Sequence, residues 1–181
     1  MRQKICMKSK SKDNMLTKEE IHLINVDYSA RIPYGLKFSF KPNEKAEVAI
    51  GVLGDSIISE SDKGGFAQHT LQMHKAYLRP LSSMTDKEIS EFCCVQGGYG
   101  VIVSRVVRSL KENSIRVILS YKNAMGHDEE FDIMIDANMC LNGKMWDWLN
   151  ARMFDYRGLI EKGLAYVAPK DLYKFDKTEI V

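Results

Sequence analysis

The sequence lacks any long apolar segment and carries almost no net charge. Its longest apolar runs, such as residues 49–53, fall far short of the roughly 20 residues that a membrane-spanning helix needs. No apolar stretch follows the N-terminal lysines, so the pattern of a secretory signal is missing as well. We therefore expect a cytoplasmic protein that does not bind membranes. Its 45% hydrophobic and 28% charged residues are typical of a folded domain.

The four cysteines have neither the spacing of a metal site nor that of a disulfide framework. Cys93 and Cys94 are adjacent, whereas Cys6 and Cys140 are isolated. A disulfide between neighbouring residues would be strained, and disulfides persist only in oxidising compartments. We therefore expect reduced thiols, and neither a metal nor a cofactor.

The small net charge hides an uneven distribution. Residues 1–14 contain five basic residues against one acidic residue, a net of +4, which leaves −2 for the remainder of a chain whose total is +2. Such a basic extension binds phosphate backbones weakly and without sequence preference. At 181 residues, the chain has the length of about one domain. We expect an N-terminal extension over 1–14 and a single α+β domain over 15–181.

The first half predicts one helix followed by an antiparallel meander. Thr17 and Glu20 have the spacing of a capping box, which predicts a helix over residues 17–26. From about residue 34 to 74, apolar and polar residues alternate between turn signals, as expected for strands. The four expected strands centre on Leu36–Phe40, Val48–Val52, Ile57–Ile58 and Phe66–Met73.

The second half predicts the capped helices that pack on this sheet, which makes the fold class α+β. Thr85 opens a second capping box, and the helix should run to about Cys94. Residues 102–110 have helical spacing, but their β-branched side chains fit a strand equally well. Further expectations are a strand pair (Ile115–Tyr121 and Glu130–Ile135), a helix capped by Asn142, and a last helix over Tyr156–Lys162, capped by Asp155 and ended by Gly163.

Gly54-Asp55-Ser56 follows an apolar run and resembles the first block of the GDS-type (SGNH) hydrolases, whose nucleophile is that serine. Such a serine needs a histidine base and an acid that orients it. That family's Asp-x-x-His and Gly-x-Asn-Asp blocks do not occur here, which leaves His69 or His74 as the base. We therefore expect a tight turn at these three residues and keep a serine hydrolase using Ser56 as the alternative.

The histidines give no metal-site pattern. His69 and His74 are five residues apart, which places them on opposite faces of a strand and poorly on a helix. Together with an aspartate they could form a site only if the tertiary fold happened to bring them together. We expect them to lie at a surface or an interface.

The candidate binding residues are aromatic and basic side chains late in the chain. Trp146 and Trp148 are two apart in a helical segment, so one should be buried and the other exposed. A mixture of aromatic and arginine side chains is typical of contact surfaces for proteins or nucleic acids, although helix packing explains it too. The candidates are Trp148, Arg152, Tyr156 and Arg157, with Arg79 from an earlier segment.

Two strings resemble segments of small uncharacterised proteins from phages and prophages of gut Bacteroidales. They are Tyr77-Leu78-Arg79-Pro80-Leu81-Ser82-Ser83-Met84-Thr85 and Phe154-Asp155-Tyr156-Arg157-Gly158-Leu159-Ile160-Glu161-Lys162-Gly163-Leu164-Ala165. Residues 97–136 depart from the resemblance and are a candidate insertion. The resemblance implies a phage accessory protein inside a bacterial cell, and it assigns no catalytic residue.

The absence of a complete catalytic set and this resemblance together favour a non-enzymatic binding protein. Its partner would be a host or phage macromolecule or a small ligand, and counter-defence is one possible use. On physical grounds, the two strings could equally be joints of the fold, because Arg79-Pro80 ends an extended segment and Asp155 begins a turn.

Overall fold

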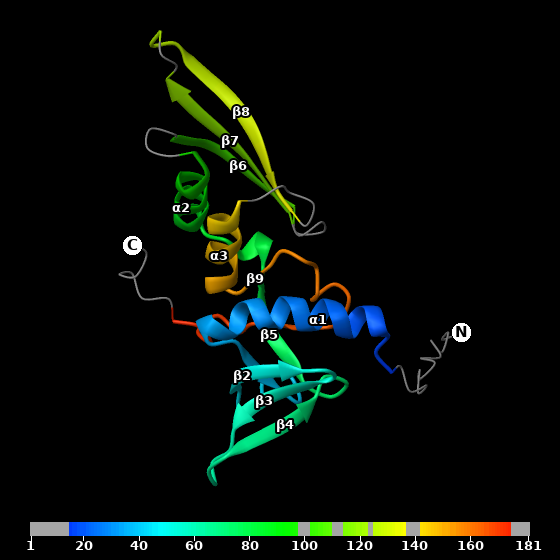
Figure 1. Ribbon diagram of the computed structural model, residues 1–181. Coiled ribbons are helices and arrows are strands. Elements are labelled where there is room, and N and C mark those ends of the chain that lie inside the picture. Colours follow the sequence, from blue (N-terminus) through cyan, green and yellow to red (C-terminus); the bar gives the residue numbers. More distant parts are fainter. Residues whose placement is uncertain (1–14, 98–101, 110–113, 123–124, 137–141, 175–181) are drawn as a thin grey trace, which may run out of the picture.

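The computed structural model describes residues 15–97, 102–109, 114–122, 125–136 and 142–174. Figure 1 shows the larger sheet at one end, a smaller separate sheet at the other, and helices between them. The antiparallel sheets and the helices confirm the predicted α+β class. The basic extension over 1–14 lies outside the described residues. Among the described residues, no helix is both long enough and apolar enough to cross a bilayer.

The first helix, α1, spans Lys18–Arg31 and begins at the predicted capping box. Thr17 Oγ1 accepts from the Glu20 amide at 3.1 Å, and the Glu20 carboxylate accepts from the Thr17 amide at 2.8 Å. The helix continues five residues beyond the predicted end at Val26, because Asp27, Tyr28 and Arg31 make buried contacts there. The 3₁₀ turn η1, Ile32–Tyr34, and Gly35 at φ 77° then end it.

The predicted meander is present, and further strands extend it. The sheet has the order β10-β5-β1-β2-β3-β4, and its neighbours in the meander are antiparallel. Two short parallel ladders at β5 add β9 and β10 from the C-terminal part of the chain. The bounds are β1 Lys37–Ser39, β2 Glu47–Leu53, β3 Ser56–Glu60, β4 Phe66–Thr70, β5 Lys75–Pro80, β9 Phe154–Asp155 and β10 Tyr166–Val167.

A β-bulge in β2 decides which side chains face outward. The register between β2 and β3 shifts between Ala49 and Gly51, so Ile50 is the extra residue. Ala49 before the bulge and Val52 after it contact the core beneath α1, whereas Ile50 is exposed. The alternation of Val48, Ile50 and Val52 therefore does not mark one common face.

The second half forms a separate sheet (Figure 1), and the helices α2 and α3 share a buried cluster with it. Residues 102–109 are a strand: Val106 packs on the core while its neighbour Val107 is exposed, which is the period of a strand. This strand pairs with the predicted strand pair in the order β6-β7-β8. The bounds are η2 Leu81–Ser83, α2 Asp86–Gly97, β6 Ile102–Ser109, β7 Ser114–Lys122, β8 Asp128–Ile135 and α3 Gly143–Ala151.

The prediction of a last helix over Tyr156–Lys162 is wrong. Asp155 does act as a cap, since its carboxylate accepts from the amides of Leu159 and Ile160 at 2.8 Å each. The segment nevertheless forms successive turns, because Gly158 adopts φ 69°, which a right-handed helix cannot contain. Gly163 has the predicted left-handed conformation, with φ 71°.

Two hydrophobic clusters hold the fold. The meander core lies between α1 and the larger sheet and includes Ile24, Phe38, Ile57 and Leu78. The hairpin core lies between the three-stranded sheet and the helices α2 and α3. Its buried members include Phe92, Ile115, Val117, Ile135, Trp148 and Leu149.

Candidate functional site

Ser56 does not have the surroundings of a nucleophile. Its side chain is buried, donates to Asp55 Oδ1 at 3.1 Å and accepts from Gln68 Nε2 at 3.0 Å. In the β3–β4 register, His69 lies opposite Ile57, so it is on the other face of the sheet from Ser56. Within the described residues, no histidine therefore serves Ser56 as a base. The alternative of a serine hydrolase has no geometrical support.

The structure brings His69 and His74 together, contrary to the expectation from their spacing. β4 ends at Thr70, and the following turn reverses the chain, so the two imidazole centroids lie 4.8 Å apart. Phe38 packs against His69, with centroids 5.0 Å apart, and Phe40 packs against His74 at 5.5 Å. The expectation of opposite faces was wrong because the strand is shorter than the predicted range of Phe66–Met73.

The five predicted binding residues lie close together, around the place where the two cores meet. The parallel pairing of β5 with β9 puts Arg79 opposite Phe154, and its guanidinium carbon lies 4.2 Å from that ring. Trp148 of α3 stacks on the same ring, with a centroid distance of 5.9 Å, and Arg152 lies 4.3 Å above Trp148. This layered arrangement is an arginine–aromatic joint between the larger sheet and α3.

The arginines of this joint already have carboxylate partners within the fold. Arg79 Nη1 binds Glu88 of α2 at 2.7 Å, and Arg152 Nη2 binds Glu91 of the same helix at 2.6 Å. Burial alone would raise the pKa of Glu88, but hydrogen bonds from Arg79 and Thr85 and the charge of Arg79 lower it below its ordinary value. These contacts tie α2 to β5 and α3, which is a packing role.

Neither aromatic candidate is on the surface. Trp148 and Tyr156 are both buried, and Trp146 is half-buried rather than exposed, because it packs against the hairpin core. The Tyr156 hydroxyl donates to Asn150 Oδ1 at 2.8 Å. The sequence therefore identified a real cluster, but the cluster is an internal joint of the fold.

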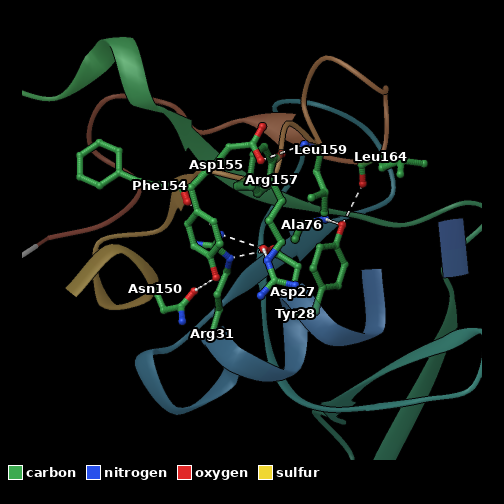
Figure 2. Close-up of polar contacts among 12 residues, drawn as sticks. Asp27, Tyr28, Arg31, Ala76, Asn150, Phe154, Asp155, Arg157, Leu159 and Leu164 are labelled. Atoms are coloured by element: carbon green, nitrogen blue, oxygen red, sulfur yellow. Dashed lines mark hydrogen bonds and ion pairs between the residues drawn. The ribbon is translucent and has the colours of Figure 1, made fainter. Parts of the chain in front are cut away.

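A buried ion pair lies beside this joint, between α1 and the C-terminal segment (Figure 2). Arg31 binds both carboxylate oxygens of Asp27, at 2.8 and 2.9 Å, and donates to the Phe154 carbonyl at 2.8 Å. Arg157 approaches the same carboxylate at 3.5 Å. Burial alone would lower the pKa of Arg31, but Asp27 outweighs that effect and raises it, so Arg31 stays charged.

Further polar contacts connect the same segments (Figure 2). The buried Tyr28 hydroxyl accepts from the Ala76 amide and donates to the Leu164 carbonyl, each at 2.9 Å. Burial raises the pKa of Tyr28, so its hydroxyl stays protonated. Burial also raises the pKa of Asp155, against the opposing effect of the two amides that it accepts from. The Tyr28 hydroxyl therefore joins α1, β5 and the C-terminal segment.

The surface feature that the sequence did not reveal is the outer face of β2, β3 and β4. There Phe66 is 79% and Leu53 is 70% exposed, and Val48 and Ile50 are exposed as well. Half-buried Ile58 lies between them, opposite Gly51 and Gln68. The one sequence signal for this face is Gly51 after Ile50, because glycine inside a strand often marks a bulge, and a bulge changes which side chains face outward. We call Val48, Ile50, Leu53, Ile58 and Phe66 the outer apolar face.

No family model, no curated protein and no solved structure matches the chain.

Proposed function

We propose that the chain is a non-enzymatic binding protein that docks a protein partner through the outer apolar face. The observation that carries the proposal is the exposure of large apolar side chains on one side of three adjacent strands. Monomeric proteins rarely expose contiguous apolar patches larger than a few hundred Å², and larger patches often mark interaction sites. An apolar protein surface is the chemistry that would cover this face.

The position of β4 supports a protein partner over a small ligand. β4 is the last strand of the larger sheet, so the main-chain groups on its open side have no neighbouring strand within that sheet. An extended segment of a partner could pair with this edge while its side chains contact Phe66. Main-chain pairing would supply affinity, and the apolar face would supply selectivity.

The arginine–aromatic joint supports the proposal indirectly. Its cations are bound to carboxylates and its aromatic rings are buried, which leaves the outer apolar face as the better contact surface. The resemblance to Bacteroidales phage proteins gives the setting: a host or phage protein in the cytoplasm of an infected cell, with counter-defence as one possible use.

The test is capture of a partner from lysates of phage-infected Bacteroidales cells by wild type and two variants. The Leu53→Ser/Phe66→Ser variant removes the two most exposed side chains of the face. The control is Met134→Ser, because Met134 is also exposed but lies on β8 of the other sheet. We expect a protein that wild type and control retain and the double variant loses. Equal retention by all three, or no retained protein, would refute the proposal.

A further inference from the structure

The contacts of His69 fix which of its nitrogens carries hydrogen. Ser59 Oγ donates its only hydrogen to the Glu47 carboxylate at 2.8 Å, so it must accept from His69 Nε2, which lies 2.9 Å away. Glu47 Oε2 is also 3.4 Å from that nitrogen. In the neutral ring, His69 therefore carries its hydrogen on Nε2, which leaves the lone pair on Nδ1.

His74 carries its hydrogen on the other ring nitrogen, Nδ1. Its Nδ1 lies 3.2 Å from the Thr70 carbonyl oxygen, which can only accept, so Nδ1 is the donor and Nε2 has the free lone pair. Within the described residues, neither free nitrogen has a hydrogen-bond partner. Three side-chain atoms there are buried without a hydrogen-bond partner: Asn25 Oδ1, Arg31 Nη1 and Trp148 Nε1. Because His69 Nδ1 and His74 Nε2 are not among them, both nitrogens are open to solvent.

Metal-ligating histidines donate their other ring N–H to a carboxylate, a backbone carbonyl or water. His74 matches this pattern through the Thr70 carbonyl, and His69 approaches it through Ser59 Oγ, which in turn donates to the Glu47 carboxylate. We propose that His69 and His74 form a two-histidine site for a divalent transition metal, with Zn²⁺ as the ion tested. Imidazole nitrogens suit Zn²⁺, Ni²⁺ and Cu²⁺.

The spacing of the rings fits one shared ion. With metal–nitrogen bonds of about 2.0–2.1 Å, two imidazoles on one ion have centroids roughly 4.5–5.5 Å apart for N–metal–N angles of about 90–120°. The observed distance is 4.8 Å, and the planes are inclined at 59°. Phe38 and Phe40 pack against the two rings and restrict their movement. The described residues hold no group of three or more potential ligands, so water would complete the coordination.

Calorimetric titration of the untagged full chain with ZnCl₂ tests the site. We expect wild type to bind Zn²⁺, and His69→Ala and His74→Ala each to weaken binding at least about tenfold. His22→Ala is the control, because His22 is exposed on α1. Zinc held by the cysteine thiols would remain in every variant and so would not mimic this result. Wild-type affinity in either variant, or no binding by wild type, would overturn the proposal.

Glu47→Ala tests the positioning role of that carboxylate, and we expect it to weaken zinc binding about tenfold. Unchanged affinity would show that Glu47 does not orient His69. A measurement on wild type alone covers the case in which a variant fails to fold. On addition of paramagnetic Ni²⁺, the ring proton NMR signals of His69 and His74 should broaden before those of His22. Equal broadening of all three would refute the pair as a site.

Discussion

The two cores of this protein are stabilised in different ways. The meander core has polar groups buried at its boundary with the C-terminal segment: the Asp27–Arg31 pair and the Tyr28 hydroxyl are inaccessible to solvent. The hairpin core is lined by apolar side chains, and ion pairs such as Arg152–Glu91 lie at its partly exposed rim. Ion pairs are thus internal to one boundary and peripheral to the other, and the buried Tyr156–Asn150 hydrogen bond of the hairpin core joins two neutral side chains.

This difference determines how much stability each core loses when a polar partner is removed. A buried charge that loses its partner pays its full desolvation penalty, whereas a rim charge is rehydrated. The meander core should therefore respond strongly to the loss of single polar partners, and the hairpin core should respond weakly to the loss of an ion pair at its rim. The following substitutions test this contrast.

The largest effect is expected for Arg31→Met. It leaves Asp27 buried with only the more distant Arg157 beside it, and it removes the donor to the Phe154 carbonyl. We expect a loss of about 3–5 kcal/mol in the free energy of unfolding. Urea unfolding followed by tryptophan fluorescence measures it.

The matched control at the rim is Arg152→Met, for which we expect a loss of about 1 kcal/mol. The double variant Asp27→Leu/Arg31→Met should regain part of the stability, because no unpaired charge stays buried. Equal losses for Arg31→Met and Arg152→Met would show that the contrast between the two cores is wrong.

The next effect is expected for Tyr28→Phe. Removal of the hydroxyl leaves the buried Ala76 amide and Leu164 carbonyl without this partner. We expect a loss of about 2 kcal/mol, the usual cost of unsatisfied buried groups. Tyr166→Phe is the control, because its hydroxyl bonds the Phe40 carbonyl at an exposed position, and its loss should stay below about 0.5 kcal/mol. Denaturant midpoints at constant m-value compare the two.

A smaller, pH-dependent effect is expected for Glu88→Gln at the hairpin rim. The folded pKa of Glu88 lies below its ordinary value, so its ionised form stabilises the fold at neutral pH, and this contribution disappears as pH falls through the folded pKa. We expect a loss of about 1 kcal/mol at pH 7. Unfolding from pH 7 to 3 should show the two proteins converging, whereas the exposed-residue control Glu60→Gln should match wild type throughout. A constant difference from pH 7 to 3 would contradict the assignment.

Local signals predicted much of the fold. The capping boxes at Thr17 and Thr85 depend on residues three apart, and both are present in the structure. The strands of the meander were found for the same reason, since alternation is a property of neighbouring residues. The predicted helix after Asp155 does not form, although its cap is present, because Gly158 adopts a left-handed conformation.

The sites were harder to predict because they arise from register and long-range contacts. Asp27 and Arg31 have the spacing of an ordinary surface ion pair on a helix, and only the packing of the C-terminal segment buries them. The outer apolar face depends on the bulge at Ile50, and the histidine pair depends on the length of β4. Neither can be read from a pattern of neighbouring residues.

The smallest effect on stability is expected outside both cores. Deletion of residues 1–14 leaves the Thr17 capping box intact, so a chain beginning at Met15 should unfold within about 0.5 kcal/mol of the full chain. The extension holds the concentrated positive charge, with a net of +4. Each of its phosphate contacts would add a salt-dependent term, so any weak DNA binding at low salt should vanish with it.

Thermal melting and DNA binding at two salt concentrations check this prediction. The control has Arg2, Lys4, Lys8, Lys10 and Lys12 replaced by glutamine. It keeps the length of the extension but not its charge, so it should melt like the full chain and bind DNA like the truncated one. Unfolding of the truncated chain would show that the extension belongs to the meander core. Tight DNA binding by the truncated chain at high salt would instead mean that residues 15–181 contain a nucleic-acid site of their own, because electrostatic contacts alone weaken steeply with salt.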